Sequence, residues 1–262
     1  MDGWIFDIDG AVTSIETRKL EHPQILEHIV EKLKDGEYVD IITGRELSWL
    51  REGVLDQLEN LIENKNLLDL VRIEREFGGV SVTYEKGESK VFKEEKFALP
   101  ENLLKRLREI LNEQFSDVFF DPGKETHFTA EIKHELNPAN FGAKKRELAE
   151  KIKKVLEEMD LDDQIEVRED ALAVNIKNRR LNKHLAADKF LKWLDEKGVK
   201  SEAFYVFGDS TSDLQIAEEL HSQGRKVVFV YTGEDELGKY PFEISITNAK
   251  YDKGTLEYLQ SN

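Results

Sequence analysis

The pattern of apolar and polar positions over the first 75 residues predicts strands alternating with helices. Short apolar runs predict the strands, and apolar residues at helical spacing between Pro23 and Gly36 predict the first helix. The expected elements are strands at 4–8, 38–42 and from 71, a helix at 23–36, and a helix at 47–68 with at least one break. This alternation is typical of a parallel sheet with crossover helices.

The pattern changes at residue 79 and returns to the first type at residue 183. Between these points we expect a hairpin at 80–92 around a turn at 85–88, strands at 118–120, 128–132, 165–167 and 172–176, and helices at 100–115 and 144–159. After residue 183 we expect helices at 185–197 and 213–220, strands at 203–207, 227–231 and 243–247, and a terminal helix. The sequence therefore predicts an α/β protein: a Rossmann-like parallel-sheet core domain of residues 1–78 and 183–262, with an inserted α+β cap domain of residues 79–182.

Composition narrows the class of protein. The longest apolar runs are too short to cross a bilayer, and the N-terminus lacks a basic segment and a cleavage site, so we expect a cytoplasmic protein without a membrane partner. The formal net charge of -16 repels polyanions, which argues against nucleic acid as a partner. Cysteine is absent, so metal ligands must be oxygen or imidazole. Abundant Glu and Lys resemble the composition of thermophile proteins.

Two carboxylates follow the first predicted strand, in the run Asp7-Ile8-Asp9-Gly10. One carboxylate can attack a phosphate ester while the other donates a proton to the leaving oxygen and later activates water. Taken alone, the pair also has a structural explanation, in which Asp9 caps a turn and Asp7 is a solvated strand end. The glycine permits the sharp turn that either arrangement needs.

A hydroxyl follows the second predicted strand, in Thr43-Gly44-Arg45. The Thr43 hydroxyl and nearby backbone N–H groups can bind a phosphate oxygen. The alternative is a helix N-cap at Thr43, with Glu46 completing a capping box. Arg45 directly follows this turn and is a further phosphate-binding candidate.

Two acids four residues apart follow the strand predicted at 203–207, namely Asp209 and Asp213. One lies at the strand end and the other in the first turn of a helix, so both can face one hard cation such as Mg²⁺. Helix capping explains either acid separately. The carboxyl ends of parallel strands gather at one edge of a sheet, so we expect all three groups to meet there. Lys183, at a predicted helix start, is the candidate cation for a transferring phosphoryl group.

These residues, in this order, resemble the four motifs of the haloacid dehalogenase superfamily of phosphohydrolases. The residues that carry the resemblance are Asp7, Asp9 and Gly10 in motif one, Thr43 in motif two, Lys183 in motif three, and Gly208, Asp209 and Asp213 in motif four. The resemblance implies that Asp7 is the nucleophile, Asp9 the general acid/base, Thr43 a phosphate ligand, and Lys183 the cation that orients Asp7 and the phosphate. It also implies Mg²⁺ held by Asp7, Asp209, Asp213 and the backbone carbonyl of Asp9.

The Thr-Gly-Arg triplet and a cap between motifs two and three are similar to the branch with Cof-type proteins, sucrose-phosphatase, trehalose-phosphatase and phosphomannomutase. Four positions depart from the usual pattern: Ala11 for Thr or Val, His184 for a Gly, Ser212 for an Asn, and Phe77-Gly78 for an Asn-Gly after the third strand. In this family the cap domain supplies the residues that recognise the leaving alcohol of the substrate. Its candidate residues here are His127, Glu131, Lys133, Asn175, Lys177, Arg179 and Arg180, each of which can equally face solvent.

The leading hypothesis is a magnesium-dependent phosphatase that acts as a monomer or homodimer on a small phosphate ester, with a sugar phosphate as the expected substrate. Phosphoglycolate phosphatase is the rival among hydrolases, favoured by a small cap pocket with one cation. A phosphomannomutase-like phosphomutase is the rival from another class, and would require a bisphosphate activator. A binding module that lost catalysis is disfavoured, because it would not need Asp9 as a proton donor.

Overall fold

The computed structural model describes residues 1–133, 142–169 and 173–261. The chain folds into two units: Met1–Phe92 with Asn182–Asn262 form the first, and Lys93–Leu181 form the second. The second unit is therefore inserted into the first along the chain, as the change of pattern predicts. Each unit has its own apolar core.

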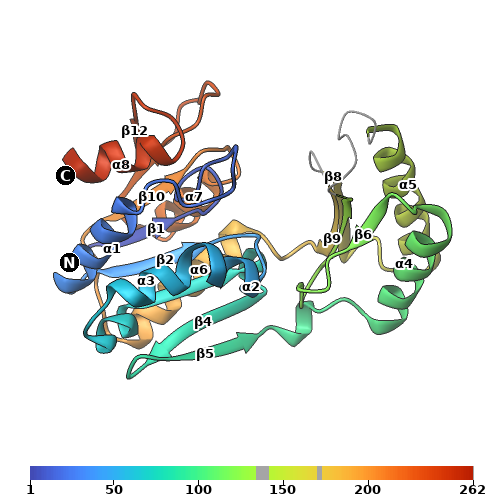
Figure 1. The fold of residues 1–262 in the computed structure, drawn as a ribbon, viewed down its shortest axis with the longest axis horizontal. Coiled ribbons are helices and arrows are strands. Elements are labelled where there is room, and N and C mark those ends of the chain that lie inside the picture. Colours follow the sequence, from blue (N-terminus) through green and yellow to red (C-terminus); the bar gives the residue numbers. More distant parts are fainter. Residues whose placement is uncertain (134–141, 170–172, 262) are drawn as a thin grey trace. The chain divides into compact units, whose positions relative to one another are not determined.

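The first unit is built on an eight-stranded sheet with the strand order β12-β11-β10-β1-β2-β3-β4-β5 (Figure 1). The strands are β1 (Gly3–Phe6), β2 (Tyr38–Ile42), β3 (Val71–Arg75), β4 (Val80–Glu85), β5 (Glu88–Lys93), β10 (Phe204–Gly208), β11 (Val227–Tyr231) and β12 (Glu243–Ile246). From β12 to β3 all neighbours are parallel, and β4 pairs antiparallel with β3. The parallel, Rossmann-like core is thus confirmed.

Helices cover both faces of this sheet. One face packs against α1 (Gln24–Lys34), α3 (Asp56–Leu61) and α8 (Asp252–Ser261), and the other against α6 (Lys183–Glu196) and α7 (Leu214–Ser222). The five residues of α1 that are buried are the apolar residues whose spacing predicts the helix, and each buried aliphatic side chain contributes roughly 1.5–3 kcal/mol. No helix in the described part of the chain is long and apolar enough to cross a membrane.

The segment expected as one interrupted helix at 47–68 is divided into short pieces. They are α2 (Leu47–Leu50), a π-helical turn η1 (Arg51–Leu55), α3, and a 3₁₀ helix η2 (Lys65–Leu70). The helical backbone continues from Leu47 to Leu61 and breaks at Ile62, whose ψ of 103° is extended, and this is the break that the sequence predicts.

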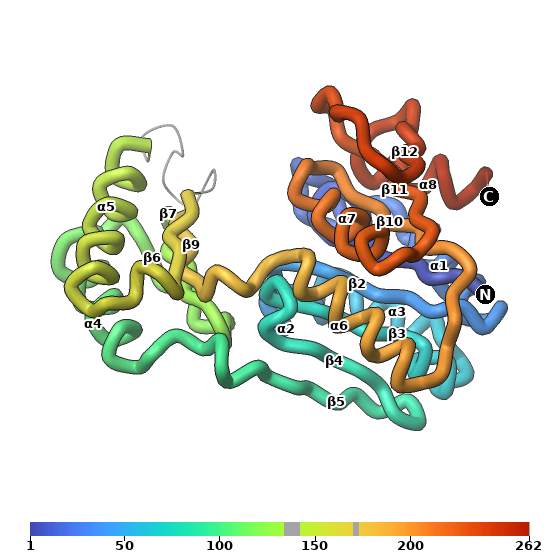
Figure 2. Tube along the Cα trace, turned by 180° about the vertical axis from the view of Figure 1, so that it is seen from behind, coloured from blue at the N-terminus to red at the C-terminus, as the bar shows by residue number. Residues whose placement is uncertain are grey.

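The boundary of the inserted unit differs from the expected one. We expected the insertion to begin at residue 79, with the hairpin in the cap, but β4 and β5 extend the sheet of the first unit beyond β3 (Figure 2). Val82 and Tyr84 on β4 are buried in the same core as the residues of β2 and β3. Pairing with β3 therefore decides the place of the hairpin, and a strand's alternation does not reveal its partner.

The second unit has a four-stranded antiparallel sheet in the order β6-β7-β9-β8, with two helices. Its elements are β6 (Val118–Phe120), β7 (Phe128–Ile132), β8 (Ile165–Glu169), β9 (Ala173–Asn178), a 3₁₀ turn η4 (Glu95–Phe97), α4 (Glu101–Gln114) and α5 (Gly142–Glu158). Both helices pack on the same face of the sheet (Figure 1). This is the α+β unit that the sequence predicts.

Candidate active site

The first strand end places Asp7 in a buried position directly after β1. The Asp7 amide donates to the Phe207 carbonyl on β10 at 3.0 Å, so the strand pairing holds this residue in place. The side chain of Asp7 is 9% exposed. The chain then turns at Gly10, which has a φ of +81°. A Cβ at Gly10 would lie 2.3 Å from Oδ2 of Asp209, so the turn needs glycine both for its backbone and for its close approach to the fourth motif.

The second strand end places Thr43 directly after β2. Its amide donates to the Glu74 carbonyl at 2.9 Å, and its hydroxyl oxygen accepts from the Arg45 amide at 3.1 Å. The expected helix cap at Thr43 is not found, because α2 is capped by Glu46, whose carboxylate accepts from the Ser48 and Trp49 amides at 2.6 Å each. Thr43 therefore belongs to the turn before the helix and not to its cap, and it is fully buried there.

The third strand end brings Asp209 and Asp213 together after β10. Asp213 is fully buried at the start of α7, but its side chain does not cap that helix. Its Oδ2 instead accepts from the amide and the hydroxyl of Ser210, at 2.9 and 2.8 Å. The capping explanation thus fails for Asp213, whose other oxygen points to Lys183.

Lys183 is the first residue of α6 and is buried, at 6% exposure. Its Nζ donates to Oδ1 of Asp7 at 2.8 Å and also to Oδ1 of Asp213. Asn182 caps the helix by accepting from the Leu185 amide at 2.9 Å, which fixes where α6 begins. Asp7 and Lys183, 176 positions apart, therefore join the two chain segments of the first unit through this ion pair.

Asp7, Asp209 and Asp213 form a group that fits a divalent metal ion. Each offers an oxygen, and these oxygens lie within 4.8 Å of one another. A set of carboxylate oxygens suits Mg²⁺, a hard cation that usually keeps several water ligands. The Asp9 side chain is not part of this group. This agrees with the sequence resemblance, which implies that Asp9 would bind the metal through its backbone carbonyl.

Burial and mutual repulsion change the proton affinities in this group. Burial raises the pKa of Asp7 well above its ordinary value, although the nearby Lys183 ammonium opposes the shift. Burial and the Asp213 carboxylate likewise raise the pKa of Asp209 to about 6. For Lys183, burial alone would lower the pKa, but the carboxylates of Asp213 and Asp7 outweigh it and raise the pKa. The group thus favours additional positive charge, which is what a metal ion supplies.

Arg45 binds Asp9 with both ends of its guanidinium group. Nη2 donates to Oδ1 at 2.7 Å and Nε to Oδ2 at 2.9 Å. The guanidinium carbon also lies 4.4 Å from the centroid of the Trp49 ring. Both members of the pair are partly exposed, at 24% for Arg45 and 39% for Asp9. A cation is therefore held at the edge of the acid group, next to the turn at Thr43.

Solved structures share this architecture over almost the whole chain. A haloacid dehalogenase-like hydrolase from Bacteroides thetaiotaomicron has a TM-score of 0.67 at 13% identity, with 99% of this chain and 98% of that chain covered. The chain has the haloacid dehalogenase-like fold. The C-terminal domain of trehalose-6-phosphate phosphatase from C. albicans has a TM-score of 0.65 at 16% identity, with 99% and 91% covered. Sucrose-phosphatase from Synechocystis has 0.54 at 18% identity, with 99% and 97% covered. No family model and no curated protein matches the sequence.

The resemblance that the sequence motifs predict is thus confirmed at the level of the fold. Within the haloacid dehalogenase-like core, the structure brings the predicted residues of motifs one, three and four into direct contact, and Thr43 of motif two lies at the neighbouring strand end. Sequence reasoning missed Ser210, which holds the carboxylate of Asp213. Its position between the two motif-four acids was the available signal, because a hydroxyl there can reach either carboxylate.

Three of the proposed cap residues share one face of the second unit's sheet. Glu131 on β7, and Asn175 and Lys177 on β9, alternate with residues that pack against α4 and α5, so they lie on the opposite face. Thr129, which we did not predict, donates to Oδ1 of Asn175 at 2.8 Å. Lys177 is 4% exposed, forms an ion pair with Glu166 at 2.5 Å and donates to the Leu181 carbonyl.

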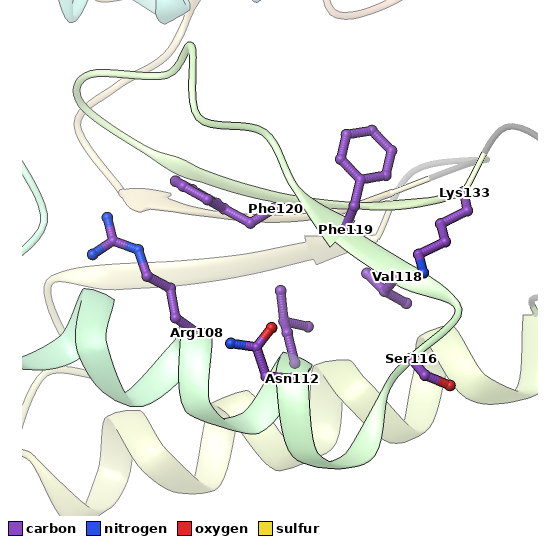
Figure 3. A pocket seen from close by; sticks show the side chains of 8 residues that line it. Arg108, Asn112, Ser116, Val118, Phe119, Phe120 and Lys133 are labelled. Atoms are coloured by element: carbon purple, nitrogen blue, oxygen red, sulfur yellow. The ribbon is translucent and has the colours of Figure 1, made fainter.

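The other cap candidates lie in different surroundings. His127 is buried just before β7, and the Arg179 guanidinium donates to the Asp162 carbonyl at 3.0 and 3.2 Å, while Arg180 is exposed. Lys133 lines a hollow of about 490 Å³ between α4 and β6, with Arg108 at its other end (Figure 3). The hollow lies within the second unit and contains none of the motif acids.

Proposed function

We propose that this protein is a magnesium-dependent phosphatase that hydrolyses a small phosphate monoester, a sugar phosphate, through a phospho-aspartate on Asp7. The observation that carries the proposal is the buried Asp7 carboxylate, which accepts from Lys183 at 2.8 Å and lies beside Asp209 and Asp213, the two acids of motif four. Burying a lysine with two carboxylates costs free energy, because each charge loses its hydration. A functional role would explain why the fold maintains such a group. Perturbed groups gathered at strand ends are typical of catalytic sites.

The residues of the site match the steps of such a reaction. A carboxylate oxygen of Asp7 attacks the phosphorus atom, and the bond to the leaving oxygen breaks as Asp9 donates a proton to it. In the second displacement Asp9 takes a proton from water, whose oxygen attacks the phosphorus and frees Asp7 and inorganic phosphate. Lys183 and the Thr43 hydroxyl donate to the phosphoryl oxygens, and Arg45 supplies a further cation beside Asp9.

Asp7, Asp209 and Asp213 are the residues that would hold magnesium, with the Asp9 carbonyl as the fourth protein ligand. Bound there, magnesium offsets the negative charge of the phosphoryl group and of the carboxylates around it. The Lys183 ammonium offsets one charge of the group. Burial, together with the Asp213 carboxylate, raises the pKa values of Asp7 and Asp209, so their ionised forms would gain from a further cation.

Sugar phosphates are the substrate class that the comparisons favour. Neighbours with TM-scores above 0.5 act, by their names, on trehalose 6-phosphate and sucrose phosphate. The polar side chains of Glu131 and Asn175, on one face of the second unit's sheet, include donors and acceptors suited to sugar hydroxyls.

The test is phosphate release from a panel of sugar phosphates, phosphoglycolate and p-nitrophenyl phosphate, with magnesium and with chelator. We expect turnover that chelator stops. The Asp7→Asn variant should fold normally and lose turnover, because the amide keeps the volume of the side chain but is not a nucleophile. Magnesium-dependent turnover by this variant would refute the mechanism. Activity only with a bisphosphate activator would instead identify a phosphomutase.

A further inference from the structure

Three consecutive residues after β3 adopt the left-handed conformation. Glu76, Phe77 and Gly78 have φ angles of +53°, +58° and +87° and form the turn η3 (Glu76–Gly78). A left-handed backbone costs free energy at each residue with a Cβ, and Asn or Gly would adopt it more easily than Phe or Glu. Such outliers persist only where the surrounding structure holds them, and they gather at functional sites.

Contacts on two sides hold this turn. The Phe77 amide donates to the Thr43 carbonyl at 3.2 Å, and Lys189 of α6 donates from Nζ to the Gly78 carbonyl at 2.9 Å. Gly78 packs so closely on α6 that a Cβ there would lie 3.1 Å from the Ala186 nitrogen. Arg75 and Glu76 are buried at 1% and 0% exposure and form an ion pair at 3.3 Å. The fold therefore maintains the turn between the phosphate-binding turn and the helix that carries the catalytic lysine.

This turn places the Phe77 ring end-on against Gly44. A Cβ at Gly44 would lie 2.7 Å from Cζ of the ring and 3.2 Å from both Cε atoms, so glycine is required there. Within residues 73–80, which the structure describes throughout, Phe77 is the one residue that is not buried. Phe77 is thus partly accessible at the strand end, with its ring against Gly44, the residue that follows Thr43.

We propose that Phe77 is a specificity-determining residue, whose ring forms an apolar wall beside the phosphate-binding turn and favours phosphate esters of a sugar ring over those of small acids. This inference rests on the proposed phosphatase function. The C–H face of a pyranose is apolar and packs against an aromatic ring, which provides large contact area with few rotatable bonds. Phosphoglycolate has two carbons and a carboxylate, and a phenyl ring offers that carboxylate no charge or hydrogen bond.

The Phe77→Asn variant tests the inference, because Asn accepts the left-handed backbone and should leave the fold intact. Phe77→Tyr keeps the ring, and Phe92→Asn removes an exposed phenylalanine from the edge strand β5, where it is 55% exposed. The measurement is kcat and KM for glucose 6-phosphate, mannose 6-phosphate, phosphoglycolate and acetyl phosphate, alongside the melting temperature of each variant.

For Phe77→Asn we expect kcat/KM for the hexose phosphates to fall about three- to tenfold, mainly through KM, with less than about a twofold change for the small substrates. Tyr should restore the wild-type values, and Phe92→Asn should change neither class. An equal effect on all substrates, or no effect, overturns the inference and leaves the phosphatase proposal standing. A wild-type enzyme that prefers phosphoglycolate to the hexose phosphates also overturns the inference and leaves the phosphatase proposal standing. If Phe77→Asn melts lower than the wild type, Phe77→Leu is measured in the same way and judged by the same criteria. A wild-type protein without turnover on any substrate refutes the proposed function itself.

Discussion

Replacing Asp40 by Asn should stabilise the protein at neutral pH. Asp40 lies in the middle of β2, is fully buried, and neither of its carboxylate oxygens has a hydrogen-bond partner among the described residues. Burial and the neighbouring Glu74 carboxylate raise the pKa of Asp40 well above its ordinary value, against the opposing effect of Arg72, the Ile41 amide and Lys189. The carboxylate is thus more costly in the folded protein than in the unfolded chain.

The magnitude has an upper limit set by proton uptake. In the unfolded chain Asp has a pKa of about 3.9, which is about three units below pH 7. Protonating the group at pH 7 therefore costs about 1.4 kcal/mol for each of these units, or about 4 kcal/mol in total. Because the folded pKa is raised, the folded protein binds more protons, and its stability falls as the pH rises from about 4 through the folded pKa of Asp40. Asp40→Asn removes this loss, and we expect a gain of about 1–4 kcal/mol at pH 7.

The assay is thermal and urea unfolding of the wild type and Asp40→Asn at intervals from pH 4.5 to 8. The stability gain should be small at pH 4.5 and grow with pH. Glu74→Gln is the comparison variant: Glu74 is equally buried, and burial raises its pKa as well, but its carboxylate accepts from Ser81 at 2.8 Å and from Arg72 at 2.6 Å. Because Gln would leave the Arg72 cation without its carboxylate, this variant should stabilise the protein less than Asp40→Asn does. A lower stability of Asp40→Asn at pH 7, or a gain that does not depend on pH, would contradict the reasoning.

Four further outcomes follow from the site. Lys183→Ala should lower turnover by at least about 100-fold and the free energy of unfolding by about 3–5 kcal/mol, because it leaves two buried carboxylates without their cation. Phosphate release and urea unfolding check this, and a wild-type rate would remove Lys183 from the mechanism. Arg45→Ala should raise KM for the phosphate ester about tenfold yet change stability by less than about 1 kcal/mol, since its pair with Asp9 is partly exposed; a large drop in melting temperature would show a structural role instead. Gly10→Ala should weaken magnesium binding in calorimetry, because its Cβ would displace Asp209, and unchanged affinity would separate Asp209 from the metal site. Added magnesium should raise the melting temperature more at pH 8 than at pH 5, because the pKa of Asp209 is about 6 and protons compete with the metal below it; an equal shift at both pH values would argue against metal binding by this carboxylate.

The elements of the first unit and the residues of its motifs could be predicted from the sequence because they depend on local patterns. The helical spacing of apolar residues in α1 matches its buried face. Likewise, the acids at 7, 209 and 213 could be assigned to one place, because parallel strands bring their carboxyl ends to a common edge.

Other features depend on contacts between distant residues, which the sequence pattern does not encode. The hairpin β4–β5 belongs to the first unit because β4 pairs with β3, and an alternating strand can join any sheet edge. The residues that follow Thr43 in the sequence suggest that it caps a helix, but in the structure Glu46 caps the first turn of α2. The ion pair of Arg45 with Asp9 joins residues 36 positions apart, and no local rule predicts it.

The sequence by itself determined the order of strands and helices, the α/β class and which polar groups follow the strands, because these depend on the periodicity of neighbouring residues and on backbone preferences. Only the tertiary structure decided which charges become buried together and which side chains meet. It buried Lys183 between Asp7 and Asp213, left the Asp40 carboxylate without a hydrogen-bond partner among the described residues, and directed the Phe77 ring to Gly44. The reason is physical: burial, proton affinity and close packing depend on what surrounds a group in space, and that is set by the folded chain as a whole.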